Sequence, residues 1–404
     1  MPQSKVVPPK YPQVGPRTFE PIQEEGSFAL ALGGLAGNNA HGAGVIEALY
    51  RKGKKPKLIT CTSGQIRYVH AYLCGLKKGS TLNPYSLLKK HFETAQPFAD
   101  LTDTNLNFKL LTWPIQQIRP AVPEFSRDIA KNMARSMRDF FKSPATFSMW
   151  RELYRMMPAR SLVSQDLILH PELFKEISDL FNDDSHGIGI IFNAYDFVEG
   201  HEHVFMNRKA AELTGHTAGT NSNSREWVRY RAITPEAVRD ALRLYEYGFD
   251  LPGNLIDGAY LRGIILNEIP HANNGISTIV VGRPLTSRWL GDAPSSLTEL
   301  RDMQTEVNFH GSYLGEKGHI ELINQLIASN HPVPPPSGAT HIDFLEVEMD
   351  RQRGWWEYVL QCEDVFNSAF HHTLTNVVPH LFPSVPTPSP AAPPAKTPEV
   401  AELV

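Results

Sequence analysis

The sequence contains little cysteine and no long apolar run. Three cysteines occur among its 404 residues, Cys61, Cys74 and Cys362. An odd and sparse set cannot form a disulfide framework and favours a reducing compartment. The first residues, MPQSKVVPPKYPQVGPR, lack the apolar core of a signal peptide. No window approaches the roughly 18 apolar residues that a membrane-spanning helix needs. We therefore expect a cytoplasmic protein rather than a secreted or an integral membrane protein.

An excess of charge of either sign is also lacking. Lys and Arg number 39 against 43 Asp and Glu, for a formal charge of −4. This balance argues against nucleic acid as a partner and against an acidic solvating tail. Hydrophobic residues make up 41% and charged residues 20%, so an ordinary globular core can form without disulfides. The length predicts two or three domains, or one large α/β domain with insertions.

Proline-rich segments mark both ends of the chain and one internal position. Residues 1–26 and 383–404 contain many prolines and few apolar side chains. Such segments cannot bury enough surface to offset their ordering entropy, so we expect two disordered tails. The segment HPVPPPSG at 331–338 has the composition of a stiff linker. Residues 331–382 are accordingly expected to form a linker followed by a C-terminal helix.

Short apolar runs and amphipathic segments alternate between the tails. Buried strands are predicted at residues 27–32, 57–60, 187–192 and 277–281. Helical spacing is found at residues 41–52, 66–76 and 297–330. This alternation predicts an α/β domain over 27–330, with a mostly parallel sheet and crossover helices. Residues 81–185 are mostly helical in pattern and rich in Phe, Met and Trp, which indicates a helical insertion or cap.

Three short motifs in the α/β region have the residue types of an acyl-transfer site. Ser63 stands at a strand-to-helix junction, Cys61-Thr62-Ser63-Gly64-Gln65, where a serine hydroxyl can project above the sheet. The glycine turn that begins at Gly33-Gly34 precedes a helix, and its amides can hold an anion. Asp257, in Ile-Asp-Gly-Ala-Tyr, can act as a general base. Each motif also has an ordinary interpretation: a helix N-cap, a packed turn and a surface turn.

In this order the three motifs resemble those of the patatin-like phospholipases, which use a Ser–Asp dyad. The stretches ALALGGLAGNNAHGAGVIEAL, ITCTSGQIRYVHA, GIGIIFNAYDFVEGHEHVF and RAITPEAVRDALRLYEYGFDLP are similar to successive segments of that family. The likeness spans roughly residues 27–330. It implies a patatin-like three-layer sandwich, an α/β fold with a central mostly parallel sheet, here of a divergent bacterial type.

The resemblance also implies an activity and its residues. Ser63 is the implied nucleophile and Asp257 the implied base of a lipid acyl hydrolase, a phospholipase A or esterase that needs no metal and no cofactor. The implied oxyanion donors are the backbone amides of Gly33, Gly34, Leu35 and Gly64. The sequence departs from the family pattern at Leu35, where a third glycine is usual, and at Gln65, where the elbow usually ends in glycine. In a second register the catalytic position falls on Arg262.

Two alternatives to an active hydrolase stay open. The departures are consistent with a catalytically weakened patatin-like protein that binds lipid or a protein partner. A nucleotide-binding α/β protein is a third hypothesis, but the glycine turn lacks both the G-x-G-x-x-G spacing and the Lys of a phosphate loop. Histidines such as His41, His70 and His310 are not positioned by any motif. Cys61 is interpreted as a packing residue.

A basic stripe in the predicted cap indicates a peripheral membrane contact. Apolar residues recur at steps of four, at Ile129, Met133, Met137 and Phe141. The basic residues of the stripe are Arg127, Lys131, Arg135, Arg138 and Lys142. Positions two apart on a helix differ by about 200°, so the two stripes lie on opposite faces. Basic amphipathic helices bind anionic membrane surfaces, and the alternative is an ordinary helix whose apolar face packs on the core.

Overall fold

The computed structural model describes most of the α/β region and shorter parts of the remainder. The described residues are 11–18, 21–34, 39–90, 118–120, 122–142, 163–165, 171–221, 225–244, 253–270, 275–290, 293–295, 297–329, 338–351 and 362–382. The predicted tail 383–404 and about half of the predicted insertion therefore lie outside the described residues. No helix in these ranges is long and apolar enough to cross a membrane.

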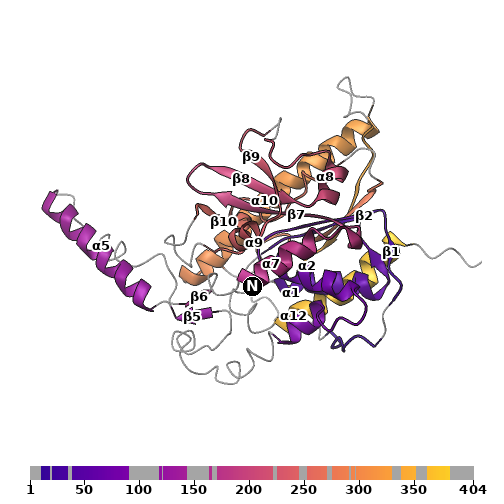
Figure 1. Cartoon of the computed structure of the whole chain (residues 1–404), viewed down its shortest axis with the longest axis horizontal. Helices are drawn as coiled ribbons and strands as arrows, with labels where there is room; N and C mark the ends of the chain where they lie inside the picture. The colour runs from indigo at the N-terminus through magenta and orange to yellow at the C-terminus, as the bar shows by residue number, and fades with distance from the viewer. Residues whose placement is uncertain are drawn as a thin grey trace, which may run out of the picture.

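An eight-stranded sheet forms the centre of the molecule (Figure 1). Its strands are β2 (Phe28–Leu32), β4 (Leu58–Cys61), β7 (Gly189–Asp196), β8 (His201–Met206), β9 (Val228–Ala232), β10 (Leu255–Asp257), β11 (Thr278–Gly282) and β12 (Asp343–Val347). Their order is β12-β11-β2-β4-β7-β8-β9, with β10 paired to β7. The first five strands are mutually parallel, and β8 and β10 run antiparallel to β7. The predicted mostly parallel sheet is confirmed.

Alternate residues of the central strands pack into two separate apolar clusters. In β2, Phe28, Leu30 and Leu32 belong to one cluster, and Ala29 and Ala31 belong to the other. Side chains alternate across a strand, so both faces of this parallel sheet are buried, as continuous apolar runs such as FALAL require. Three layers result, an arrangement compatible with the patatin-like fold that the sequence resemblance implies.

Helices cover both faces of the sheet. The first cluster includes side chains from α1 (Asn39–Arg51), α2 (Gln65–Leu76), α7 (Pro171–Phe181), α9 (Pro235–Ala241) and α12 (Cys362–His372). The second includes side chains from α8 (Arg208–Thr214) and the long helix α10 (Leu297–Ala328). In Figure 1, α1, α2, α7 and α12 lie together below the sheet, and α10 crosses behind it.

The C-terminal part of the chain belongs to the same unit as the sheet. β12 pairs with β11 along its full length, and Ala369 of α12 approaches Gly44 of α1 so closely that a Cβ there would lie 3.1 Å from it. Helix α12 is followed by a π-helical turn, η6 (Thr373–Val377), and by α13 (Val378–Leu381). The predicted boundary at residue 330 therefore does not separate two folded units, because the sheet continues beyond the proline-rich linker.

The N-terminal segment is packed where a tail was predicted. Arg17 forms a bidentate pair with the fully buried Glu47 of α1, at 2.9 and 2.6 Å, and its guanidinium lies 3.5 Å from the ring centre of Tyr50. Val14 is buried, and β1 (Glu24–Glu25) pairs with β3 (Lys54–Lys55). The prediction of a tail over residues 1–26 is wrong for residues 11–18 and 21–25, because specific contacts with α1 offset the cost of ordering them.

Within residues 81–185, the described elements are of two kinds. The helix α7 packs on the sheet beside α2 and belongs to the core. Residues 84–90 are also helical and bury Leu87 and Leu88. The second kind comprises the short antiparallel pair β5 (Ile118–Pro120) and β6 (Val163–Gln165) and the helix α5 (Val122–Lys142). Figure 1 shows α5 directed away from the sheet.

Candidate active site

Ser63 occupies a strained turn between β4 and α2. Its φ is +56°, and it is the only non-glycine residue with a positive φ among the described residues. L-residues rarely adopt this left-handed conformation, which costs about 1–3 kcal/mol and is found mainly at functional sites. The turn directs the chain from the carboxyl end of a buried strand into a helix whose first residue is Gln65. This is the backbone arrangement of a nucleophile elbow.

The glycine turn after β2 lies directly against this elbow. A Cβ on Gly34 would lie 2.4 Å from the carbonyl oxygen of Thr62 and 2.5 Å from the Cβ of Ser63. Only glycine fits at such a separation, because the first contact is with backbone that cannot move aside. The two motifs that the sequence placed 30 residues apart are thus in van der Waals contact at the carboxyl ends of adjacent strands.

Asp257 belongs to a strand that pairs with β7, as β4 does. β4 and β10 pair with the same edge of β7, since β8 occupies the other edge at these residues. Thr60 opposes Ile191, three residues before Ala194 along β7. Asp257 opposes Ala194 from the other direction. The two strands thus approach along one edge of β7 from opposite directions, with Ser63 two residues after the end of β4 and Asp257 at the end of β10.

Both side chains of the predicted dyad are buried. Asp257 is 1% exposed and Ser63 is 4% exposed. Asp257 Oδ1 accepts a hydrogen bond from the Ala259 amide at 2.9 Å, which fixes the carboxylate at the start of the turn η5 (Gly258–Tyr260). Asp257 also takes part in a further interaction within the fold.

The backbone amides predicted to bind the oxyanion differ in whether they already donate hydrogen bonds within the fold. The Gly33 amide donates to Gly282 O at 3.0 Å, and the Gly34 amide donates to Thr62 Oγ1 at 2.7 Å and to Gly263 O at 3.2 Å. Both amides would have to exchange these bonds for an oxyanion. Leu35 lies outside the described residues. The Gly64 amide makes no hydrogen bond with any described residue, and it stands at the N-terminus of α2. Of the three described amides, it is the one that the fold leaves available to bind an anion.

Two buried polar residues that the motif analysis missed hold the site together. Thr62 Oγ1 accepts from the Gly34 amide and donates to Gly263 O at 2.8 Å. Gln65, fully buried, donates from Nε2 to Gly33 O at 3.2 Å, and its side chain fills the space beside Gly42. The departure at Gln65 from the usual elbow glycine is therefore compensated by contacts with the glycine turn. Polar residues at alternate positions of the apolar strand LITCT are the signal that could have identified Thr62.

The competing residues are placed elsewhere. Arg262 is buried and pairs with Glu202, Glu268 and Glu316 at 2.8, 2.7 and 3.3 Å, so it lies in an ion-pair cluster. Burial raises the pKa of the Cys61 thiol, which keeps it protonated and agrees with a packing role. Among the described contacts of His310 is a 2.9 Å approach of its Nδ1 to Arg283.

A small apolar pocket adjoins the glycine turn. Gly33, Gly34, Gly263, Phe309 and Tyr313 are among its lining residues, and Ser63 is not. The ring of Phe309 lies against Gly263, where a Cβ would be 2.4 Å from it. The pocket therefore borders the segment that carries Asp257 and does not itself open onto the hydroxyl of Ser63.

The comparisons with known proteins give only distant likenesses. No protein-family model matches the chain, and no curated protein matches it. VipD from Legionella pneumophila is 10% identical, with a TM-score of 0.28, over 92% of this chain and 71% of that chain. A chain from the complex of SpcU with ExoU, of the type III secretion system of Pseudomonas aeruginosa, is 13% identical, with a TM-score of 0.21. That match covers 77% of this chain and 57% of the other. Likenesses at these TM-scores do not assign a family.

Proposed function

We propose that this chain is a serine hydrolase of the patatin type that cleaves carboxylic esters of lipids through Ser63 and Asp257. The observation that carries the proposal is the left-handed backbone of Ser63 at a buried strand-to-helix turn. An N-cap serine, the ordinary alternative, has extended backbone and a side chain bonded to the helix. Here the residue directly before α2 is Gly64, and no side chain caps this helix end.

The proposed reaction follows the chemistry of a dyad. The Asp257 carboxylate accepts the proton from Ser63 Oγ as Oγ attacks the ester carbonyl. The tetrahedral oxyanion is stabilised by the Gly64 amide, with Gly33, Gly34 and Leu35 as the further predicted donors. One such donor contributes roughly 3–4 kcal/mol to transition-state stabilisation. The intermediate then expels the alcohol, which takes the proton from Asp257, and water hydrolyses the acyl-enzyme by the same route. The dyad requires no metal and no cofactor.

A catalytically weakened protein that binds lipid or a protein partner is the second candidate. Two observations favour it: the amides of Gly33 and Gly34 are engaged within the fold, and Ser63 is 4% exposed. Hydrolysis of a short-chain nitrophenyl ester by the full chain distinguishes the two candidates. Turnover that is lost in both Ser63→Ala and Asp257→Asn, at unchanged melting temperature, supports the hydrolase. Absence of turnover by the parent on every ester tested supports the weakened protein.

We also propose that α5 contacts an anionic membrane surface. The alternative, in which its apolar stripe packs on the core, requires that stripe to be buried. Met133, Met137 and Phe141 are instead 49%, 53% and 75% exposed, and Arg127, Lys131, Arg135 and Arg138 are exposed on the other side. The side chain of Lys142 lies outside the described residues. An exposed apolar stripe opposite a basic one is the pattern of a helix that lies in a membrane interface.

A further inference from the structure

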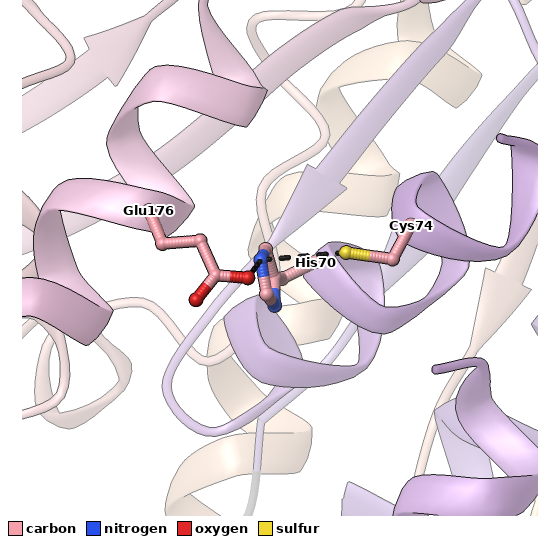
Figure 2. A group of neighbouring side chains, drawn as sticks. All are labelled: His70, Cys74 and Glu176. Carbon is pink, nitrogen blue, oxygen red and sulfur yellow. Dashed lines mark hydrogen bonds and ion pairs between the residues drawn. The ribbon is translucent and has the colours of Figure 1, made fainter. Parts of the chain in front are cut away.

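Three side chains with metal-binding atoms meet between α2 and α7, away from the dyad (Figure 2). His70 and Cys74 stand one turn apart on α2, and Glu176 projects toward them from α7. The Nε2 atom of His70 lies 3.6 Å from Cys74 Sγ and 3.4 Å from Glu176 Oε1. All three donor atoms lie within 4.8 Å of one another.

The spacing of these atoms fits a tetrahedral zinc ion. Zinc binds sulfur at about 2.3 Å and nitrogen or oxygen at about 2.0–2.2 Å. With tetrahedral angles, these lengths place a sulfur and a nitrogen about 3.6 Å apart, and a nitrogen and an oxygen about 3.4 Å apart. Two of the three separations in the cluster already have these values. The side chain of Glu176 is 61% exposed, so its carboxylate can move to bring the third separation, from Cys74 Sγ, to the tetrahedral value.

We propose that His70, Cys74 and Glu176 form a binding site for a zinc-type divalent cation, with water as the fourth ligand. The donor set of thiolate, imidazole and carboxylate is the one that zinc prefers. One thiolate and one carboxylate balance the two positive charges of the ion. Binding displaces the thiol proton of Cys74 to solvent. The exposed side of Glu176 leaves the fourth position open to water.

The charges around the cluster predict which ions it selects. Arg67 and Lys77 both act electrostatically on His70. These positive side chains oppose the binding of a metal cation at the cluster. A site that depends on thiolate and imidazole bonds to overcome this repulsion disfavours the oxygen-seeking ions Ca²⁺ and Mg²⁺. Zinc is therefore expected to bind, and magnesium is not.

The site has a mechanical consequence that does not depend on hydrolase activity. His70 lies seven residues after Ser63, which is about 10 Å along the helix, so the ion lies outside the proposed dyad. It ties α2, the helix that begins at the elbow, to α7. An ion that binds only the folded chain raises its stability in proportion to the logarithm of its concentration.

The test is zinc binding by the full chain after treatment with a chelator. Competition against a chromophoric chelator should show one ion bound per chain and a melting temperature that rises with zinc. Removal of an outer-shell partner alone weakens metal binding by up to about 100-fold. Cys74→Ala and Glu176→Gln each remove a direct ligand and should therefore weaken zinc binding by at least that factor. Glu172→Gln is the matched control, because it removes an exposed carboxylate from the same helix one turn away and should bind zinc as the parent does.

Cobalt(II) gives a readout that does not depend on stability. A cobalt ion bound to the Cys74 thiolate in tetrahedral geometry produces a thiolate charge-transfer band and strong visible bands. Both should appear in the parent and in Glu172→Gln and disappear in Cys74→Ala or, if that variant does not fold, in Cys74→Ser. Zinc uptake that is equal in the parent and Cys74→Ala, or no uptake of either metal by the parent, overturns the proposal. The cluster is then only a set of hydrogen bonds.

Discussion

Gly34 and Ser63 are in direct contact: a Cβ added to Gly34 would lie 2.5 Å from the Cβ of Ser63. The contact joins two loops that follow adjacent parallel strands, β2 and β4. Ligand sites in open α/β sheets lie at the carboxyl ends of strands, and this pair of loops lies at such an end. The close approach of the two loops thus requires that residue 34 has no side chain.

Replacement of Gly34 by alanine should damage both stability and activity. The new methyl group would lie 2.4 Å from the Thr62 carbonyl oxygen, so the backbone must shift at a cost of about 1–3 kcal/mol. Urea denaturation and ester hydrolysis measure the two effects. Gly311→Ala is the control, because Gly311 lies in α10 with nothing within 4 Å of an added Cβ. It should stabilise the protein by about 0.5–1 kcal/mol, and equal losses in both variants would contradict the prediction.

The hydroxyl of Thr62 should contribute to stability through its two hydrogen bonds. Thr62→Val keeps the shape of the side chain but removes the acceptor for the Gly34 amide and the donor to Gly263 O. A lost partner of a buried polar group costs about 1–3 kcal/mol. Thr62→Ser retains the hydroxyl and should retain most of the stability in urea denaturation. A valine variant as stable as the parent would show that these bonds are not maintained in solution.

The Arg262 cluster should give two glutamate variants of unequal effect. Burial tends to raise the pKa of Glu268, but Arg262 and Arg225 outweigh it and lower that pKa to about 2. Burial dominates at Glu202 and raises its pKa. At pH 7, Glu268→Gln should lower the free energy of unfolding by about 3–5 kcal/mol, as expected when a buried pair is broken. Glu202→Gln should cost clearly less, since folding disfavours the ionised form of Glu202.

The lowered pKa of Glu268 also predicts how the stability difference between the parent and Glu268→Gln depends on pH. Because the pKa of Glu268 is lower in the folded state, its ionisation stabilises the fold above the unfolded pKa of about 4.3. That contribution is lost as the pH falls toward about 2. Denaturation of the parent and Glu268→Gln between pH 7 and 3 should therefore show a difference that shrinks below about pH 4. A difference that is constant over this range would exclude the ion pairs as its source.

The proposed membrane contact of α5 makes a prediction that depends on salt. Exchange of Arg127, Lys131 and Arg135 for glutamine should weaken binding to anionic liposomes at least about tenfold, since one basic residue near such a surface contributes about 1 kcal/mol. The loss should diminish as salt rises, and hydrolysis of soluble esters should be unchanged. The control exchanges the exposed residues Lys52, Lys78 and Lys175 for glutamine, the same change of charge at other sites. Equal vesicle binding by the two triple variants would refute a specific role for α5.

The central strands could be predicted from the sequence because each is a buried parallel strand with a continuous apolar run. FALAL and LITC have every residue buried. The strand β12 was missed because DFLEV is short, has acidic residues and lies at the edge of the sheet, where only Val347 is buried. Its partner β11 precedes it by about 60 residues of chain, so no local pattern connects them.

The candidate site was predictable only in those parts that depend on a local sequence pattern. Glycine turns and a serine at a strand end are local signals, and they made Ser63, Gly33 and Gly34 candidates, which the structure brings together. The engagement of the glycine amides was not predictable, because their partners, Gly263 O and Gly282 O, come from distant segments. The role of Gln65 depends likewise on Gly33 and Gly42, which only the folded chain brings beside it.

The central claim is that Ser63 is an activated nucleophile, and a fluorophosphonate probe tests it most directly. The probe forms a covalent bond with the hydroxyl oxygen of an activated serine and releases fluoride. Mass spectrometry of the labelled and digested chain should place the adduct on Ser63. Labelling should be absent from Ser63→Ala and strongly slowed in Asp257→Asn. A folded parent chain that takes up no probe, or one that takes it up at another residue and keeps it in Ser63→Ala, would contradict the account.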